Sequence, residues 1–431
     1  MKLNVRRTAL LGLAFMSISA FWGLYDFAVP LILKNTYQLG DTASGVVMAM
    51  DNIVALVLLP VFGSLSDRCR SPLGRRMPFI LIGATTAALL TLLVPLLVRV
   101  APLWQFLTLL ALLLITMGTF RSPAVALMPD VTPKPLRSKG NAVIKLMGAI
   151  GGALSLVMVN FLVRKVTLPD GGTGSDYTLL FVAVAVILAG AAWVVRLCIP
   201  ERKLAAEADA VNARLAPAAE VTQKGGRSLS RGEMRSLVLI LCSVSLWFMG
   251  YNAVSTAFSK YAMHTLQVEE AAAANCMLVA TVAAIASYWP VGLLSSRFGR
   301  KKMILAGVIM LLLAFAAAGF MTTLNALAFV LFALVGVGWA TISVNSYPMV
   351  VELASGSDVG RYTGYYYTFS MAAQVLTPVI SGALMEHVGY GTLFPYAAIM
   401  LLLALVTMSL VRHGDSKPVA RKGLEALDVE D

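Results

Sequence analysis

The stretch Gly63-Ser-Leu-Ser-Asp67-Arg68-Cys-Arg70-Ser-Pro-Leu-Gly74-Arg75-Arg76 is a short, very basic loop between two long apolar runs. A second version, Gly292-Leu-Leu-Ser-Ser-Arg297-Phe-Gly299-Arg300-Lys301-Lys302, lies between two further apolar runs. The two copies begin 292 − 63 = 229 residues apart, which is about half of the 431-residue chain. A loop that recurs at half the chain length indicates a duplicated bundle of membrane helices.

The composition is that of an integral membrane protein. Hydrophobic residues make up 58% of the chain and charged residues 13%. An ordinary soluble domain has about 45–50% apolar and about 25% charged residues. A soluble fold of this composition would expose far too much apolar surface to water, so we expect a lipid bilayer to surround the chain.

The net charge of +12 is explained by topology. Most of the 34 Lys and Arg residues lie in the tails and in loops that alternate onto one side of the predicted membrane. The exceptions are five residues on the other side and two within apolar runs: Lys34, Arg99, Arg164, Lys165 and Lys260, then Arg121 and Lys145. The positive-inside rule therefore predicts that both termini are cytoplasmic. We expect a multi-pass protein of the plasma (bacterial inner) membrane with no nucleic-acid partner.

Twelve apolar runs are long enough to span a bilayer, which takes roughly 20 residues each. They cover residues 8–33, 42–64, 77–99, 103–128, 139–163, 177–198, 235–260, 271–295, 302–322, 325–348, 360–385 and 391–412. The predicted fold is an all-α membrane protein with two pseudo-symmetric six-helix halves, residues 1–198 and 235–412. A polar cytoplasmic linker with at most one amphipathic turn, residues 199–234, joins them, and a polar tail, residues 413–431, follows.

The internal repeat extends beyond the basic loops. Trp22-Gly-Leu-Tyr25-Asp26-Phe-Ala in the first helix corresponds to Phe248-Met-Gly-Tyr251-Asn252-Ala-Val in the seventh. Pro129-Asp130 with Arg137, after the fourth helix, is echoed by Glu352 with Arg361 after the tenth. Several matched pairs at nearly one offset favour a gene duplication over chance.

These loops resemble the signature of the major facilitator superfamily, a Gly followed by Asp-Arg and then by Gly-Arg-Arg or Gly-Arg-Lys. The stretch from Gly63 to Ile80 is also similar to the sucrose carriers and their relatives among the glycoside–pentoside–hexuronide:cation symporters. Two further stretches look like that branch: Arg121-Ser-Pro-Ala-Val-Ala-Leu-Met-Pro-Asp130, and Asn345-Ser-Tyr-Pro-Met-Val-Val-Glu352. The resemblance covers nearly the whole chain and implies a twelve-helix carrier of sugars.

The chain departs from that pattern at several positions. Sodium-coupled melibiose carriers place acids where this chain has Ala55 and Leu59, so the resemblance favours protons as the coupling ion. Plant sucrose carriers have an Arg where this chain has Val125. The resemblance therefore supports a sugar as the solute more strongly than it supports sucrose in particular. Arg121 is a nearby candidate to replace the missing arginine.

Charged residues inside the apolar runs are the candidate site for solute and protons. A charge near the bilayer centre costs about 2.5–3.5 kcal/mol, so its presence needs a reason. Asp26 and Asp51 lie at a similar depth on adjacent helices, and two acids in a low dielectric favour keeping one of them protonated. Asp26 also matches the helix-1 Asp of the melibiose carriers. The alternative is that these acids only bond neighbouring helices.

Two bases lie nearer to the cytoplasmic side. Arg121 is too deep to reach the interface easily and is predicted to pair with solute or with a carboxylate. Lys145 has the same prediction, with snorkelling to the interface as the alternative. Between the acidic and basic levels we expect a cavity rather than a rigid ion pair.

Aromatic and amide side chains are predicted to line that cavity, because rings stack on sugars and amides bind hydroxyl groups. The main candidates are Tyr25, Asn252 and Asn345, and the others are Trp22, Tyr251, Trp339 and Tyr366. The alternative for the aromatic residues is packing or anchoring at the membrane interface.

Charged residues at the cytoplasmic surface are predicted to form a gate between the two halves. They are Asp67, Arg75, Arg76 and Asp130 in the first half and Arg300, Glu352 and Arg361 in the second. The alternative is that they set topology only.

Together these observations predict a secondary transporter, a proton-coupled symporter of a sugar or glycoside such as sucrose or maltose, working by alternating access. The alternatives are an exporter or exchanger of another small polar solute and, more remotely, a membrane-embedded sensor or enzyme. No HExxH, GxSxG or P-loop motif is present, so we expect neither catalysis nor ATP-driven transport. The four Cys and three His residues have no metal-site spacing, and we expect no metal and no cofactor.

Overall fold

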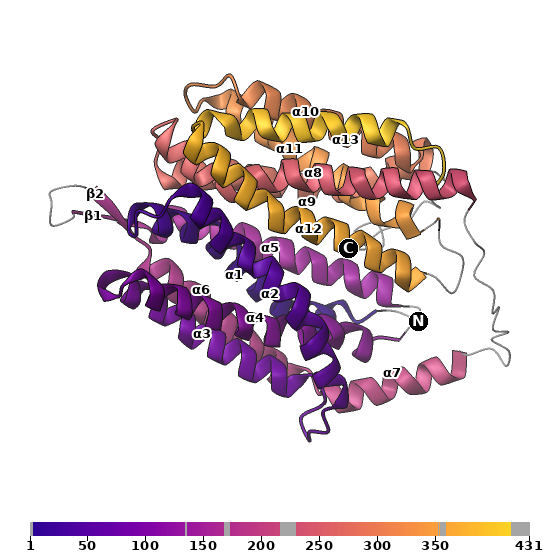
Figure 1. Ribbon diagram of the computed structural model, residues 1–431. Coiled ribbons are helices and arrows are strands. Elements are labelled where there is room, and N and C mark those ends of the chain that lie inside the picture. The colour runs from indigo at the N-terminus through magenta and orange to yellow at the C-terminus, as the bar shows by residue number, and fades with distance from the viewer. Residues whose placement is uncertain are drawn as a thin grey trace. The chain divides into compact units, whose positions relative to one another are not determined.

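The computed structural model of the protein describes residues 3–133, 136–167, 173–215, 230–351, 353 and 359–414. Within these ranges, twelve helices are long and apolar enough to cross a membrane. Figure 1 shows the helices and the short strand pair in chain order. The predicted all-α, multi-pass fold is confirmed. Most of the predicted tail, from residue 415 onward, lies outside the described residues.

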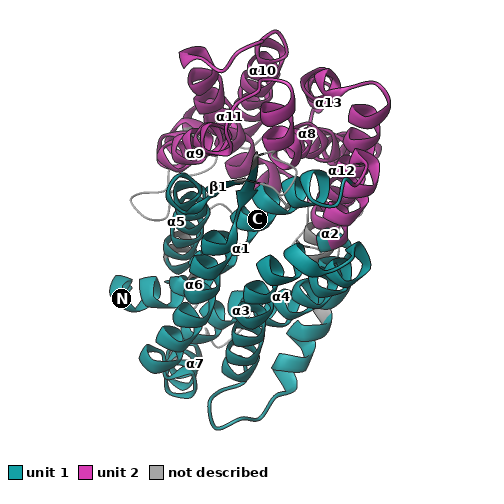
Figure 2. Cartoon of the chain, turned by 90° about the vertical axis from the view of Figure 1, so that its left-hand side faces the viewer, with its two compact units in different colours: residues 1–38, 51–216 teal, residues 39–50, 217–431 magenta. Residues whose placement is uncertain are grey.

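The contacts divide the chain into two compact units (Figure 2). The first unit comprises residues 1–38 and 51–216. Its elements are α1 (Val5–Asn35), the later part of α2 (Asp41–Arg68), α3 (Met77–Val100), α4 (Leu103–Val131), α5 (Arg137–Leu162), β1 (Arg164–Thr167), β2 (Thr173–Asp176), α6 (Thr178–Cys198) and α7 (Glu201–Leu215). In this unit α1 packs against α5 and α6, α3 packs against α4 and α6, and α7 packs against α4.

The second unit comprises residues 39–50 and 217–431, so it includes the beginning of α2. Its other elements are α8 (Arg231–His264), α9 (Glu270–Phe298), α10 (Arg300–Ala318), α11 (Ala326–Val351), α12 (Val359–His387), the 3-10 turn η2 (Tyr390–Thr392) and α13 (Leu393–Ser409). Here α11 packs against α9 and α10, and α8 packs against α12 and α13.

Glycine allows the helix axes to approach closely in both units. A Cβ atom on Gly151 of α5 would lie 2.0 Å from the Met16 carbonyl oxygen of α1. In the second unit, a Cβ on Gly336 of α11 would lie 2.0 Å from the Ala280 carbonyl oxygen of α9. Helices in lipid gain little from hydrophobic burial against one another, so small residues at the interface, which permit dense packing, stabilise the pair.

Large apolar side chains cover the outside of the helices as well as their interior. Ile82, Trp193 and Phe320 have exposed fractions of 66%, 52% and 89%. Such side chains would be unfavourable in water, and lipid solvates them. An α-helix satisfies most of its backbone polar groups internally, as a hydrocarbon environment requires.

Three local features differ from the sequence expectations. Residues Glu201–Leu215, predicted as a polar linker with at most one turn, form the 15-residue helix α7. The segment between the fifth and sixth spans forms an antiparallel hairpin in which Arg164 pairs with Asp176 and Thr167 with Thr173. Helix α8 continues past its predicted end at residue 260, so Lys260, expected in an outer loop, is inside the helix and 3% exposed.

Candidate functional site

A group of charged and aromatic side chains lies among the spanning helices of the first unit. Trp22 and Tyr25 are one turn apart on α1, with ring centroids 5.5 Å apart in an edge-to-face arrangement. The guanidinium carbon of Arg121, from α4, lies 6.0 Å from the centroid of the Trp22 ring. This distance is that of a cation–π contact, which offsets part of the cost of an arginine within a spanning helix.

Asp51 of α2 joins this group. Its Oδ1 accepts hydrogen bonds from the backbone N–H of Asn52 at 2.6 Å and from the Asn52 side chain at 2.7 Å. The Asp51 carboxylate is close enough to the Asp26 carboxylate to repel it and close enough to Arg121 to attract it. The structure therefore brings Asp26, Asp51 and Arg121 into one electrostatic group.

The polar atoms of the two aromatic residues in this group are buried. Tyr25 is only 2% exposed, and within the described part of the chain its hydroxyl has no hydrogen-bond partner. The Trp22 indole nitrogen is buried and lacks a partner there in the same way. A buried donor left without an acceptor costs about 1–3 kcal/mol.

The remaining predicted solute-binding residues lie on other helices of the two units. Lys145 lies on α5 of the first unit, with its ammonium nitrogen buried. Asn252 and Asn345 lie on α8 and α11 of the second unit. Asn345 is 1% exposed and donates to the Thr341 carbonyl oxygen of its own helix at 2.9 Å, so one of its two N–H donors is already used.

An aromatic stack joins the same two helices, α8 and α11, in the second unit. The rings of Tyr251 and Trp339 are 3.8 Å apart at an interplanar angle of 9°, and Phe248 meets Trp339 edge to face. Tyr366 exchanges a hydrogen bond of 3.0 Å with the hydroxyl of Ser346.

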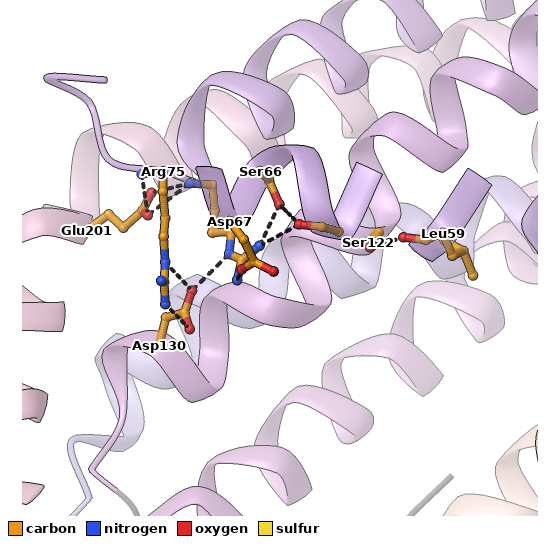
Figure 3. A network of polar contacts seen from close by, with 9 residues as sticks. Leu59, Ser66, Asp67, Arg75, Ser122, Asp130 and Glu201 are labelled. Carbon is orange, nitrogen blue, oxygen red and sulfur yellow. Dashed lines mark hydrogen bonds and ion pairs between the residues drawn. The ribbon is translucent and has the colours of Figure 1, made fainter. Parts of the chain in front are cut away.

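The first basic loop forms a compact ion-pair network at the end of the first unit (Figure 3). Arg76, only 5% exposed, donates from Nε to Asp130 at 2.9 Å, from one terminal nitrogen to the Gly63 carbonyl oxygen at 3.2 Å, and from the other to Asp67. Arg75 binds the same Asp130 with two hydrogen bonds, 3.1 Å from Nε and 2.6 Å from a terminal nitrogen. The hydrogen bond with Asp130, together with the charges of Asp130, Asp67 and Glu201, raises the pKa of Arg75 against an opposing contribution from burial.

Glu201, the first residue of α7, completes this network and was absent from the predicted gate. Its carboxylate accepts hydrogen bonds from the backbone N–H groups of Arg75 at 2.8 Å, Arg76 at 2.9 Å and Met77 at 2.8 Å. The first N–H groups of a helix have no partner within it, and negative charge is favourable at that end. Glu201 therefore caps α3. The only sequence signal was an acid directly after Pro200 at the start of the supposed linker.

Gly74 makes this capping possible. Its φ of +117° is in the region that favours glycine. A Cβ atom on it would lie 2.2 Å from Oε2 of Glu201. Glycine therefore both allows the turn and leaves room for the carboxylate.

The second basic loop has related geometry with different partners. Gly299 has a φ of +92° and immediately precedes α10. Lys301 donates to the carbonyl oxygens of Ser409 at 2.9 Å and Val411 at 2.6 Å, at the C-terminal end of α13, where a cation is favourable. Of the gate residues predicted in this unit, Arg300 begins α10, Glu352 lies outside the described residues, and the side chain of Arg361 is likewise not described. Their gating role stays a prediction.

Comparisons with known proteins agree with this architecture. The model of the Major Facilitator Superfamily matches residues 11–289 and 239–427, which is nearly the whole chain. A curated relative from Metarhizium majus (strain ARSEF 297), "MFS-type transporter ppzB", is 30% identical over 122 residues, or 28% of this chain. The same-named protein of Metarhizium rileyi (strain RCEF 4871) is 29% identical over 122 residues. The chain spans about a quarter of the length of these relatives, 26% and 25%.

Solved transporters share the fold at low sequence identity. A bacterial homologue of the human lysosomal transporter Spinster, inward-facing and occupied, has a TM-score of 0.69 and 14% identity and covers 95% of this chain and 97% of its own. A POT family transporter in complex with 5-aminolevulinic acid has a TM-score of 0.70 and 10% identity, covering 94% and 96%. The nucleoside transporter NupG has a TM-score of 0.65 and 14% identity, covering 95% and 100%. With its twelve spanning helices and this family match, the chain belongs to the Major Facilitator Superfamily and is a transporter, not an enzyme.

Proposed function

We propose that this transporter is a proton-coupled symporter of a sugar or glycoside, such as a disaccharide, that works by alternating access without a cofactor. Its proposed place is the plasma membrane, with both termini cytoplasmic. The observation that supports this proposal is the group of Asp26, Asp51 and Arg121 beside the buried hydroxyl of Tyr25, which has no hydrogen-bond partner among the described residues.

The donors and acceptors of this group suit a polyhydroxyl solute. A sugar hydroxyl both donates and accepts, so one hydroxyl would donate to an aspartate oxygen while a neighbouring one accepts from Tyr25 or Trp22. The aromatic faces of α1 would cover the apolar faces of a sugar ring. Solute binding would then give hydrogen-bond partners to the Tyr25 hydroxyl and the Trp22 indole nitrogen, which have none among the described residues. These hydrogen bonds would add to the affinity for the solute.

The charge balance of the group supports proton coupling. With both acids ionised, Asp26, Asp51 and Arg121 carry a net charge of −1, and one bound proton makes the group neutral. A neutral group is far less costly than a charged one in a low-dielectric bundle. The bundle would therefore rearrange most easily when it carries both a proton and a solute, which is the condition for symport.

A transport assay tests this proposal. The protein is reconstituted in liposomes that contain a pH-sensitive dye, and disaccharides, monosaccharides and glycosides are added outside. We expect one of these sugars to acidify the lumen, and Asp26→Asn to abolish that signal. Asp209→Asn, which removes an exposed carboxylate on α7, is the matched control and should transport normally. Absence of proton movement with every sugar tested would contradict the proposal.

The Tyr25 hydroxyl offers a second test that separates solute binding from folding. Tyr25→Phe removes a buried hydroxyl that has no partner within the described ranges, so we expect the solute-free protein to gain about 1 kcal/mol of stability. The same substitution should raise the KM for the sugar several-fold, because the solute loses a hydrogen bond. An unchanged KM would exclude Tyr25 from the solute site.

A second candidate function is the export or exchange of another small polar solute. Proteins of the same fold are named for varied solutes, 5-aminolevulinic acid for one and nucleosides for another. This variety supports export or exchange as an alternative function. In the liposome assay it would appear as counterflow of a labelled solute with no accompanying pH change.

A further inference from the structure

A small cavity lies at one end of the first unit, where the ends of four spanning helices meet. Its volume is about 150 Å³. The walls come from the first turns of α1, the segment between α4 and α5, and Ile199 directly after α6. None of the solute-binding or gate residues predicted from the sequence is among its described lining residues. The cavity is therefore separate from the candidate site.

The cavity is apolar on its buried side and polar on its exposed side. Leu11, Leu136 and Ile199 are all buried and give the apolar part of the lining. Arg7, which is half-buried, and Asn4, which is exposed, give the polar part. This division suits a ligand with a charged group attached to an apolar body.

Arg7 carries a positive charge that no acid of the described chain compensates. Within the described ranges its guanidinium takes part in no ion pair and no hydrogen bond. The two acids nearest to the cavity in sequence, Asp130 and Glu201, are both bound by Arg76, the first through its side chain and the second through its backbone N–H. An anionic ligand would supply the missing negative charge.

The polar side of the cavity offers mainly hydrogen-bond donors. The side-chain oxygen of Asn4 already accepts from the Arg7 backbone N–H at 3.0 Å, which leaves the amide N–H groups of Asn4 as donors. The guanidinium of Arg7 adds five further N–H donors in a planar fork. Such a fork matches the oxygens of a phosphate group in a bidentate arrangement. A phosphate therefore fits the donors better than a neutral solute does.

Size and position limit what can carry this phosphate. A cavity of this volume is large enough for a ligand about the size of benzene, so a phosphate group fits and a whole lipid molecule does not. The cavity lies at the ends of spanning helices, where the hydrocarbon core gives way to lipid headgroups. Basic pockets between membrane helices at this level are suited to anionic headgroups.

We propose that this cavity binds the phosphate group of an anionic phospholipid, such as phosphatidylglycerol, through Arg7 and Asn4. The glycerol carbons of the lipid would contact Leu11 and Leu136, and its acyl chains would remain in the bilayer. The bound headgroup would connect α1 with the segment between α4 and α5. Since it binds the folded unit, it would stabilise that unit by mass action.

A lipid titration of the purified protein tests this proposal. The full chain is held in an uncharged detergent, and its unfolding temperature is measured against increasing phosphatidylglycerol. Phosphatidylcholine with the same acyl chains and inorganic phosphate are titrated in parallel, and native mass spectrometry counts the bound lipids. We expect phosphatidylglycerol to raise the unfolding temperature to a plateau. Phosphatidylcholine should give no plateau, because its choline cation would lie beside Arg7.

Two variants locate the binding site. Arg7→Gln removes the cation and should weaken phosphatidylglycerol binding roughly tenfold or more, since charge-assisted hydrogen bonds are lost. Asn4→Asp keeps the cap of α1, because Asp caps a helix as well as Asn does, but it places a negative charge beside the phosphate. It should weaken binding in the same way. Arg6→Gln is the matched control: it removes an exposed neighbouring arginine that does not line the cavity, and should leave the affinity unchanged.

Equal affinities of the Arg7→Gln and Arg6→Gln proteins, or equal stabilisation by phosphatidylcholine, would overturn the proposal. If Arg7→Gln does not fold, Asn4→Asp decides alone, and an unchanged affinity there would overturn it as well. A plateau reached with inorganic phosphate but not with phosphatidylglycerol would show that the ligand is free phosphate and would overturn the lipid. The titration needs no transport, so its result is independent of whether the protein moves a sugar.

Discussion

The carboxylate of Glu201 accepts a hydrogen bond from the backbone N–H of Met77 at 2.8 Å, so the first residue of α7 caps the first turn of α3. The same carboxylate holds the N–H groups of Arg75 and Arg76, whose side chains bind Asp130. The helix between the two halves of the sequence is thereby attached to the basic loop of the first unit (Figure 3).

Removal of this cap should destabilise the first unit. Glu201→Ala leaves three backbone donors without their acceptor at a buried helix end, and we expect a loss of about 1–3 kcal/mol in the free energy of unfolding. Glu201→Gln keeps one acceptor oxygen and should lose less. Thermal unfolding of the purified protein in detergent measures the change. Glu207→Ala, at an exposed position of the same helix, is the control, and an equal loss there would refute the capping role.

Gly74→Ala should cost more than an ordinary substitution at a positive-φ glycine. Gly74 and Gly389 have similar φ values of +117° and +127°, but a Cβ on Gly389 would meet no atom within 4 Å. Gly389→Ala therefore reports backbone strain alone, about 1–2 kcal/mol. Gly74→Ala adds a collision with Glu201, so its unfolding temperature should fall further. Equal losses at the two positions would show that the Glu201 contact does not constrain the loop.

The two adjacent arginines should differ sharply in importance. The Arg76 side chain is 6% exposed and bridges Asp67 and Asp130, whereas the Arg75 side chain is 45% exposed. Arg75→Ala removes a half-exposed guanidinium and leaves Asp130 paired with Arg76, so we expect a loss of about 1 kcal/mol or less. Arg76→Ala removes a buried guanidinium that pairs with Asp67 and Asp130 and donates to the Gly63 carbonyl oxygen, so it should greatly reduce both stability and transport. Arg76→Lys should not restore them, because an ammonium cannot reproduce the planar fork. Similar effects of the two alanine variants on unfolding would contradict this distinction.

The hairpin in the first unit should contribute stability that depends on pH. Burial alone would raise the pKa of Asp176. Hydrogen bonds from Thr178 and the charge of Arg99 lower it by a larger amount, so the pKa of Asp176 is below its usual value. A carboxyl group whose pKa is lower in the folded protein than in the unfolded chain stabilises the fold. This stabilisation is fully present above the unfolded pKa of about 3.9, and it is lost as the pH falls through the pKa of the folded protein.

Unfolding temperatures at pH 6 and pH 3 measure this contribution. The wild type should be more stable than Asp176→Asn at pH 6, and the difference should shrink at pH 3. A difference that is the same at both pH values would show that the Asp176 carboxylate does not carry it.

The sequence alone determined the number of spanning helices and their approximate positions. A span is a local property, because about 20 apolar residues are needed to cross the bilayer and each helix satisfies its own backbone bonds. The repeat of the basic loop at residues 63 and 292 likewise predicted the duplicated architecture. Four gate residues of the first half, Asp67, Arg75, Arg76 and Asp130, were named from their charge and position, and the structure places them in one network.

Only the tertiary structure decided which of these charges meet and which other residues join them. The role of Glu201 depends on a carboxylate that lies 124 residues from Met77, and a buried ion pair joins Asp41 to Lys260, 219 residues apart. The length of an apolar run indicates the length of a spanning helix, but it carries no information on which other helix end lies beside it. The difference in burial between Arg75 and Arg76 has the same origin. Burial depends on the helices that pack around the loop, and two adjacent arginines cannot be told apart from the sequence alone.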